Sequence, residues 1–271
     1  MSNSERNAET GGSNDHGRSS RTNHDVVAII IGRAGSRGVP NKNIMPLGGV
    51  PMVWHSIRIA DDARCVNSIL VSTDSEELMR QARDCPCRTL LRTIERPSLL
   101  ATDSASVQDT VRHAVLTAES LAPVIVVLYC NVPVRPADLI DRAVERLIET
   151  GADSVQSYVP SGKHHPSWQI TLGKDDRTQP WSTEVPHRRQ NLIPAYAHDG
   201  GIIAVTRNAL FRLSEEGPHA FLGRDRRAII NEPGDVVDID DAFDLVVAAA
   251  AIEYRETRQR CERARSGAFL P

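Results

Sequence analysis

The stretch VVAIIIGRAGSRGVPNKN, residues 26–43, joins an unbroken apolar run to a loop rich in glycine and positive charge. A near-continuous run of β-branched residues predicts a strand that is buried on both faces, as in a parallel sheet covered by helices. In the loop, Arg33, Arg37 and Lys42 are crowded together, which costs free energy unless an anion lies among them. The glycines allow tight turns that bring backbone N–H groups to such an anion. The stretch therefore predicts a buried strand that ends in an anion-binding loop.

Two common phosphate-binding patterns do not fit this loop. Lys42 lies too far along for the P-loop pattern G-x-x-x-x-G-K-[ST], and no Ser or Thr follows it to reach magnesium. The spacing G-x-G-x-x-G is also missing. The alternative to an anion site is a solvated turn with spare charges. We favour the anion site, because three cations among glycines suffice to meet a triphosphate.

Segments of strand and helix character alternate behind this loop. Strands are predicted at 26–31, 68–74, 123–129 and 153–159, and helices at 52–63, 75–84, 104–121 and 137–151. This alternation predicts an α/β fold with a doubly wound, mostly parallel sheet. Ser104 is the expected cap of the third helix, and Gly151 is expected to end the fourth. Ligands bind such sheets at the carboxyl ends of the strands, where the loop, Asp74 and the segment CNVPVRP (130–136) should meet.

The chain divides into three parts by composition. Residues 1–25 are polar, lack the apolar core of a secretory signal, and are predicted to form a disordered tail. Residues 26–250 are predicted to form a single domain, and 251–271 to form the end of a C-terminal helix and a tail. Within the domain, the alternation breaks at about 161–198, where prolines and two of the three tryptophans indicate a smaller hairpin-rich insertion. The insertion is expected to lie over a site or against a partner subunit.

Composition excludes several kinds of partner. Among 271 residues the net charge is −3, so nothing global favours nucleic acid or an anionic membrane surface. No apolar run reaches the roughly 18 residues of a membrane span. The five cysteines are few and scattered, which favours a reducing compartment and a cytoplasmic location over a disulfide framework.

A second group of functional residues lies in VVDIDDAFD, near the end of the chain. In a strand, residues two apart face the same way, so Asp238 and Asp240 would share one face while Val237 and Ile239 face the core. Paired carboxylates beside a cationic loop suit a magnesium ion that bridges protein and phosphate oxygens. The sequence therefore predicts a Mg²⁺ site at this pair.

Structural interpretations stay open beside the functional ones. Asp74 is equally suited to cap the next helix or to touch the nucleotide. His165 is suited to a sugar-acid contact or a dimer contact, and one of Arg188 and Arg189 is expected to be a surface charge. Asp241 and Asp244 have a structural interpretation instead. Their spacing fits the N-cap and N3 positions of the last helix, where acids are favoured.

Five motifs together resemble one enzyme family. In chain order they are GRAGSRGVPNKN, VSTDSEEL, RPSLLATDSAS, RRQNL…DGGIIAV and VDIDDAFDL. Their order and spacing over about 26–250 resemble the cytidylyltransferases that activate N-acylneuraminate and related nonulosonic acids. The 3-deoxy-octulosonate cytidylyltransferases are more distant relatives. The resemblance implies transfer of CMP from CTP to the anomeric hydroxyl of a 2-keto sugar acid, release of pyrophosphate, use of Mg²⁺, and a homodimer whose subunits exchange the insertion.

The resemblance also implies roles for individual residues. The residues implied in nucleotide binding are Arg33, Ala34, Gly35, Ser36, Arg37, Gly38, Lys42, Asn43, Arg96 and Ser106. The residues implied in binding the sugar acid are Tyr129, Asn131, Arg135, His165, Arg189, Gln190, Tyr196, Asp199 and Gly200. The residues expected to carry catalysis are Arg33 and Lys42 together with the metal pair Asp238 and Asp240.

The acceptor half departs from the family pattern. Where many relatives read L-Q-P-T-S-P-L-R, this chain reads LYCNVPVR, so that Tyr129 and Asn131 replace Gln and Thr and only Pro133 and Arg135 persist. Asp199 stands where relatives have Asn before glycine. These changes predict an unusual acceptor. Two alternatives stay open, namely transfer of another nucleotide such as guanylyl to a sugar phosphate, and a non-catalytic sugar-nucleotide-binding relative.

Overall fold

The computed structural model describes residues 24–35, 38–182, 188–212, 217 and 219–267. The strands of its central sheet are β1 (Val26–Ile31), β4 (Ser68–Thr73), β5 (Leu90–Glu95), β6 (Val124–Tyr129), β7 (Ser154–Pro160), β10 (Tyr196–Thr206) and β11 (Arg226–Ile230). Their order across the sheet is β11-β7-β10-β6-β1-β4-β5. Only β10 runs antiparallel to its neighbours, β6 and β7, within this sheet of the described chain. The predicted mostly parallel sheet is confirmed. The tail expected at 1–25 lies outside the described residues except for its last two.

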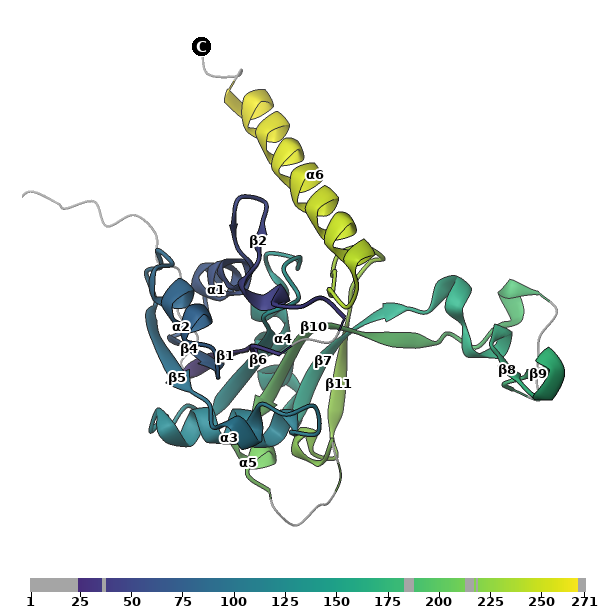
Figure 1. Cartoon of the computed structure of the whole chain (residues 1–271), viewed down its shortest axis with the longest axis horizontal. Coiled ribbons are helices and arrows are strands. Elements are labelled where there is room, and N and C mark those ends of the chain that lie inside the picture. Colours follow the sequence, from purple (N-terminus) through teal and green to yellow (C-terminus); the bar gives the residue numbers. More distant parts are fainter. Residues whose placement is uncertain (1–23, 36–37, 183–187, 213–216, 218, 268–271) are drawn as a thin grey trace, which may run out of the picture.

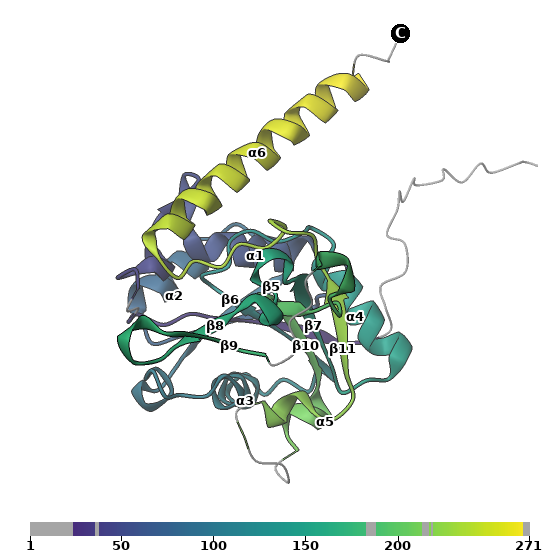
Figure 2. The ribbon, with the colours of Figure 1, turned by 90° about the vertical axis from the view of Figure 1, so that its right-hand side faces the viewer.

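Helices cover both faces of the sheet. They are α1 (Met52–Asp62), α2 (Glu76–Arg83), α3 (Val107–Thr117), α4 (Leu139–Thr150), α5 (Arg207–Leu210) and α6 (Ala242–Gly267). One apolar cluster joins the sheet to α1, α2, α4 and the first turns of α6, and a second joins the opposite face to α3 and α5 (Figure 2). Successive residues of β1 alternate between the two clusters, as period-two side chains must. This is the doubly wound arrangement that the sequence predicts.

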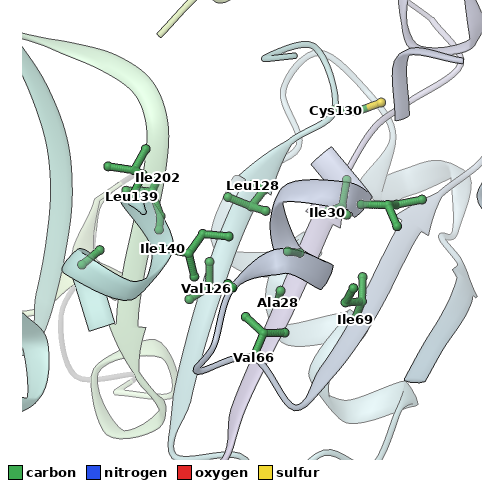
Figure 3. Packing of buried hydrophobic residues seen from close by; sticks show 14 of the residues in the cluster. Ala28, Ile30, Val66, Ile69, Val126, Leu128, Cys130, Leu139, Ile140 and Ile202 are labelled. Carbon is green, nitrogen blue, oxygen red and sulfur yellow. The ribbon is translucent and has the colours of Figure 1, made fainter. Parts of the chain in front are cut away.

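The strand VVAIII is fully buried, as expected for the middle of such a sheet. Each of its six residues is less than 9% exposed. Figure 3 shows Ala28 and Ile30 of β1 beside Val126 and Leu128 of β6, with Ile140 of α4 beside the two β6 residues. The carboxyl end of β1, where the cationic loop begins, is therefore held rigidly on both sides by parallel strands.

The edge strands β5 and β11 were not expected from the sequence. Both mix charged and apolar residues, and Leu90 at the start of β5 is 65% exposed. An edge strand with one solvated face needs no continuous apolar run, which is the signal that identifies the central strands.

Three expectations about helix ends can be compared with the structure. Gly151 ends α4 in the left-handed region (φ 64°), as predicted. The expected cap at Ser104 is wrong, because α3 begins at Val107 and Ser106 Oγ accepts the N–H of Asp109. Before α6, the acids Asp241 and Asp244 form the predicted cap, and their carboxylates accept each other's backbone N–H groups.

The short strand expected before α6 is reduced to one bridge. Val237 pairs with Val134 in antiparallel fashion, and the chain on either side is irregular. Val237 and Ile239 are nevertheless buried, so the alternation of core and site residues that the sequence predicts is present over these few residues. The acids between them are discussed below.

Residues 161–195, here called the arm, leave the body between β7 and β10. The arm contains a two-stranded hairpin of β8 (Ile170–Leu172) and β9 (Thr178–Pro180), as the expected hairpin-rich insertion requires. Figure 1 shows the arm projecting from one side of the body and α6 projecting from another. A second small hairpin, β2 (Pro46–Leu47) with β3 (Val50–Pro51), precedes α1. Among the described residues, no helix has both the length and the apolar character to cross a membrane.

Candidate active site

A cavity of about 250 Å³ opens at the carboxyl ends of β1 and β6, and we call it the strand-end cavity. It is lined by Ile31, Gly32, Arg33, Gly35, Lys42, Asn43, Arg96, Leu100, Thr102, Asp103, Ala105, Val107, Thr110, Tyr129 and Asn131. Residues from the cationic loop, from the predicted nucleotide motifs and from the segment after β6 therefore meet in one place, as the topology rule predicts.

The first part of the loop is fixed by contacts to neighbouring segments. Asn43 Nδ2 donates to the carbonyl of Arg33 at 2.9 Å, so the two ends of the loop are tied together. Asp74 Oδ1 accepts the N–H of Ala34 at 2.9 Å. The helix behind Asp74 is capped by Ser75, whose Oγ accepts the N–H of Leu78. Asp74 thus supports the loop and does not cap the helix.

Arg33 is paired with an acid that sequence reasoning missed. Its guanidinium lies 2.5 Å from a carboxylate oxygen of Asp103, and both side chains line the cavity. Asp103 belongs to the stretch RPSLLATDSAS, which the family resemblance singled out as a motif without assigning this residue a role. Membership of that motif was the one signal that pointed to it.

Arg96 and Asn43 form the inner wall of the cavity, and both are buried. Arg96 Nη2 donates to the carbonyl of Gly32, and burial lowers the pKa of Arg96 although the charge of Asp74 opposes this. Each of the two wall residues keeps one buried polar atom without a hydrogen-bond partner in the described structure, Nε of Arg96 and Oδ1 of Asn43. A buried donor and a buried acceptor left open beside a cavity are suited to a polar ligand.

The acids from the end of the chain meet the cationic loop at the mouth of the cavity. Lys42 Nζ lies 3.2 Å from Asp240 Oδ1 and also donates to the carbonyl of Ile239. The Asp240 side chain is 82% exposed, whereas that of Lys42 is 12% exposed. Asp238 lies deeper, where its carboxylate accepts from the amide of Asn131. The contact between the front and the back of the chain, on which the sequence interpretation depends, is present.

The nearby cations offset the negative charge of Asp238 only in part. Burial and, to a smaller extent, the nearby charge of Asp240 raise its pKa to about 6, although Lys42 and Arg135 act in the opposite direction. Two neighbouring carboxylates, one of them half-buried, form a pair of hard oxygen donors whose repulsion a divalent cation would relieve. Within the described residues, no group of three or more His, Cys, Asp or Glu side chains is arranged as a metal site. The metal site predicted at Asp238 and Asp240 therefore stays a prediction.

The loop and the acids approach so closely that a side chain would not fit between them. A Cβ atom built on Gly38 would lie 2.0 Å from the carbonyl oxygen of Asp240. Glycine at this position is therefore required by the packing of one backbone on the other.

The guanidinium of Arg135, which the resemblance implies in acceptor binding, is surrounded by protein groups. It is 4% exposed and its guanidinium donates to the carbonyls of Gly201, Val132 and Tyr129 and to Ser56 Oγ. Burial lowers the pKa of Arg135 to about 10, and the charge of Asp238 acts against this. Its hydrogen-bonding groups are turned to the protein, so the structure assigns it to positioning the segments that surround Asp238.

Asp199 and Gly200, like Arg135, shape the segments that surround Asp238. Asp199 Oδ1 accepts from Ser157 Oγ and from the N–H of Gly201, and Oδ2 accepts from Asn231 Nδ2. A Cβ on Gly200, where φ is +72°, would lie 3.2 Å from Asp238 Oδ2. Asp199 thus fixes the turn in β10 that leaves space for the carboxylate of Asp238.

The arm residues that sequence reasoning placed at the acceptor do not line the strand-end cavity. His165 is buried within the arm, where Nε2 contacts the carbonyl of Ile193 and Nδ1 accepts the N–H of Ser167. Gln190 and Tyr196 are exposed. The backbone of Arg189 lies in a short 3₁₀ turn, and its side chain lies outside the described residues.

The remaining sequence predictions concern the loop and the third helix. Ser36 and Arg37 lie outside the described residues. Ser106 caps α3, and its neighbours Ala105 and Val107 line the cavity. The roles of these residues in nucleotide binding stay predictions.

Comparisons with known proteins agree with this geometry. Residues 27–196 match the family model described as cytidylyltransferase. N-acylneuraminate cytidylyltransferase A of Danio rerio is 33% identical over 170 residues, which is 61% of this chain and 38% of that protein. N-acylneuraminate cytidylyltransferase of Oncorhynchus mykiss is 30% identical over 200 residues, which is 72% of this chain and 44% of that protein. The match thus spans less than half the length of these curated relatives.

A solved structure shows the same fold. It is described as CMP:2-keto-3-deoxy-manno-octonic acid synthetase complexed with CTP, and it superimposes with a TM-score of 0.64 at 16% identity, covering 85% of this chain and 99% of that one. Because the family model covers more than half of the chain, the protein belongs to the cytidylyltransferase family.

Proposed function

We propose that this protein transfers CMP from CTP to the anomeric hydroxyl of a nonulosonic or related 2-keto-3-deoxy sugar acid and releases pyrophosphate. The observation that carries the proposal is the contact between Lys42 and Asp240 at the mouth of a cavity lined by Arg33 and Arg96. This contact supports a site that combines cations suited to phosphate with acids suited to a metal. Family membership and the names of the relatives support cytidine as the base and a sugar acid as the acceptor.

The reaction requires stabilisation of phosphate charge. The sugar hydroxyl oxygen forms a bond to the α-phosphorus, the bond from that phosphorus to the bridging oxygen breaks, pyrophosphate leaves, and the hydroxyl proton is lost to the medium. Negative charge grows on the phosphate oxygens and on the departing group. Arg33 and Lys42 lie on a loop whose two ends are tied together, so their backbone is already in place to present positive charge to these oxygens.

Entry of the nucleotide requires a local exchange of partners. In the structure described here, Arg33 is paired with Asp103 and Lys42 with Asp240. Phosphate oxygens would replace these carboxylates as partners of the two cations. The open Asn43 Oδ1 and Arg96 Nε on the inner wall are the groups available to the ribose and base.

We also propose that Asp238 and Asp240 hold magnesium. The raised pKa of Asp238 and the repulsion between the two acids fit a bound divalent cation, and carboxylate oxygen is the ligand that Mg²⁺ prefers. When bound there, the ion would supply additional positive charge to the phosphate oxygens. Three residues would position Asp238 for metal binding. Asn131 donates to its carboxylate, and Asp199 and Arg135 both bond to the backbone of Gly201 in the neighbouring β10 turn.

The test is pyrophosphate release from each of the four nucleoside triphosphates, with and without Mg²⁺, in the presence of a panel of 2-keto sugar acids and of sugar phosphates. We expect release with CTP, a sugar acid and Mg²⁺ together. Release with GTP and a sugar phosphate would favour the guanylyl alternative instead. Absence of release with every combination would favour a non-catalytic binding protein.

A pair of chains is part of this proposal. Apolar side chains are exposed on the arm, as is typical of surfaces that bind a partner. The arm residues predicted to touch the acceptor do not line the strand-end cavity of their own chain. Both observations are explained if the arm packs against a second copy and brings these residues to that copy's cavity. We therefore propose a homodimer.

A further inference from the structure

A second cavity, of about 380 Å³, lies directly beside the strand-end cavity, and we call it the adjoining cavity. The two share Val107 and Tyr129 as wall residues, so a ligand at the strand-end cavity can extend past Tyr129 into the adjoining one. Tyr129 also feels the charge of Asp238, because burial and that carboxylate together raise the pKa of its hydroxyl. The adjoining cavity therefore begins next to the place where the acceptor would react.

The floor of the adjoining cavity is apolar except for one amide. Ile203, Phe221 and Leu222 are each no more than 3% exposed and give it an aliphatic and aromatic base. Gln156 is 8% exposed, and its Oε1 accepts from the hydroxyl of Tyr158. Its Nε2 has no hydrogen-bond partner in the described part of the chain. A floor of this kind accommodates a hydrocarbon stem and offers one N–H donor to a carbonyl.

The rim of the adjoining cavity is rich in donors and positive charge. Arg226 is fixed there, because Nε and Nη2 donate to the carbonyls of Gly223 and His219, which leaves Nη1 free of any partner that the described residues supply. The rings of His198 and His219 also lie at this rim, and His198 packs edge-on against Tyr158.

Acidic groups are missing from this lining. None of the cavity's described lining residues is Asp or Glu. Two acids are adjacent in sequence to lining residues. Asp199 has both oxygens occupied by Ser157, Gly201 and Asn231, and Asp225 is paired with Arg227. Across the described chain, Arg226 forms no ion pair, whereas its neighbour Arg227 is paired with Asp225 at 2.9 Å. A fixed guanidinium with an open N–H group above an apolar floor is the arrangement that recognises a carboxylate on a short hydrocarbon stem.

We propose that the adjoining cavity binds the far end of the acceptor and selects acceptors whose substituent carries a carboxylate on a short acyl chain. The inference rests on the proposed cytidylyl transfer and extends it from the class of sugar acid to the substituent. Arg226 is the specificity-determining residue, and Gln156 and the two histidines supply the remaining hydrogen bonds. This assignment gives a physical reason for an acceptor that differs from a plain N-acetyl sugar acid.

The experiment measures CTP-dependent pyrophosphate release with three neuraminic acids that differ only in the N-acyl group, namely acetyl, glycolyl and succinyl. One charge-assisted hydrogen bond in a partly buried site corresponds to roughly a tenfold preference or more. We therefore expect kcat/KM for the succinyl compound to exceed that for the acetyl compound about tenfold. The glycolyl compound, with a hydroxyl but no charge, should fall between them.

Two matched variants locate the effect. Arg226→Gln should lower the ratio of succinyl to acetyl kcat/KM about tenfold. Arg227→Gln should leave that ratio unchanged, because residues 226 and 227 face opposite sides of β11. Arg226 is exposed, so the variant should fold, and its thermal unfolding midpoint checks this.

Each outcome has a distinct meaning. Equal or better turnover of the acetyl compound, or a ratio that Arg226→Gln leaves intact, would overturn the assignment of the adjoining cavity while cytidylyl transfer stands. Failure of every acceptor to release pyrophosphate would overturn the proposed function itself, and this inference with it.

Discussion

Gly38 shows how one residue without a side chain decides whether the site forms. Its backbone lies against the carbonyl of Asp240, so a methyl group would push the cationic loop away from the acids. We expect Gly38→Ala to lower kcat/KM for CTP at least tenfold while the unfolding midpoint changes little, because the loop is at the surface of the fold. Steady-state kinetics and thermal unfolding measure the two effects.

The control for this variant is Gly173→Ala in the arm. A Cβ at Gly173 would make only an ordinary contact of 3.6 Å with the carbonyl of Arg177, and its φ is not in the left-handed region. Its kinetics should match those of the parent chain. Unchanged kinetics in Gly38→Ala would contradict the close approach that the structure shows.

Lys42 carries the second prediction at this scale. Its side chain is mostly buried and pairs with Asp240, so it is held in one position beside the cavity. Removal of one preorganised cation costs roughly 3–4 kcal/mol of transition-state stabilisation. We expect Lys42→Met to lower kcat by about 10²–10³-fold, as measured at saturating CTP and Mg²⁺. Lys174→Met, an exposed change in the arm, is the control. A fall in CTP affinity alone, with kcat intact, would limit Lys42 to binding the ground state.

The sequence predicted which charged residues would lie near one another better than it predicted the residues that contact them. Arg33, Lys42, Asp238 and Asp240 could be found because like charges crowded together need an explanation. The role of Asp103 could not be found, because a single acid in a polar loop has many explanations until the fold brings it to Arg33. Arg135, which the family resemblance implies in acceptor binding, donates to the backbone carbonyls around it, and these contacts could not be read from the sequence.

At the scale of elements, Asp141 connects α4 to the chain that follows α1. Its carboxylate accepts the N–H groups of Arg64 and Cys65 and the Nε of Arg64. Burial alone would raise the pKa of Asp141, but the hydrogen bonds from Cys65 and Arg64 outweigh it and lower the pKa below its usual range. A lowered pKa means that the carboxylate stabilises the folded state above its unfolded pKa, and that this stabilisation is lost as the pH falls through the folded value.

We therefore expect Asp141→Asn to lower the free energy of unfolding by about 2 kcal/mol at pH 7, since several hydrogen bonds to a charged acceptor are weakened. The difference from the parent chain should shrink as the pH falls below about 4, where the carboxyl becomes protonated in the unfolded chain and then in the folded chain. Urea unfolding at pH 7 and at pH 3.5 measures this. Asp138→Asn, an exposed change on the same helix, should cost less than about 0.5 kcal/mol at both values. A cost that does not vary with pH would show that packing, not charge, is responsible.

The sequence predicted elements well where burial imposes a simple period. β1, β4, β6 and β7 are apolar runs that both faces of the sheet require, and the helices between them show regular apolar spacing. β5 and β11 could not be predicted in this way. Their own sequences show no regular apolar pattern, and they are strands because they pair with β4 and β7. The arm could be predicted as an interruption of the strand–helix alternation. The register of its hairpin could not, because no local sequence pattern specifies which residues of β8 and β9 pair.

At the scale of the whole molecule, the arm's exposed apolar residues bear on the number of chains. Ile170 and Leu172 of β8 are 51% and 67% exposed, and Trp181 after β9 is 66% exposed. We expect light scattering to give twice the chain mass of 29.8 kDa. The double change Ile170→Asp and Leu172→Asp should give monomers with low activity, because the proposed contact with the second copy is lost.

The control for this test uses the other side of the same hairpin. Thr171 points away from Ile170 and Leu172, so Thr171→Asp should leave both mass and activity close to those of the parent chain. A parent chain that behaves as a fully active monomer would contradict the proposed pair.

The junction of Lys42 with Asp240 spans 198 positions of the chain. During translation, all seven strands of the central sheet are made before residue 240 leaves the ribosome, because β11 ends at Ile230. A chain made only as far as β11 would therefore contain every strand of the central sheet and still lack Asp238 and Asp240, the two acids of the proposed metal site.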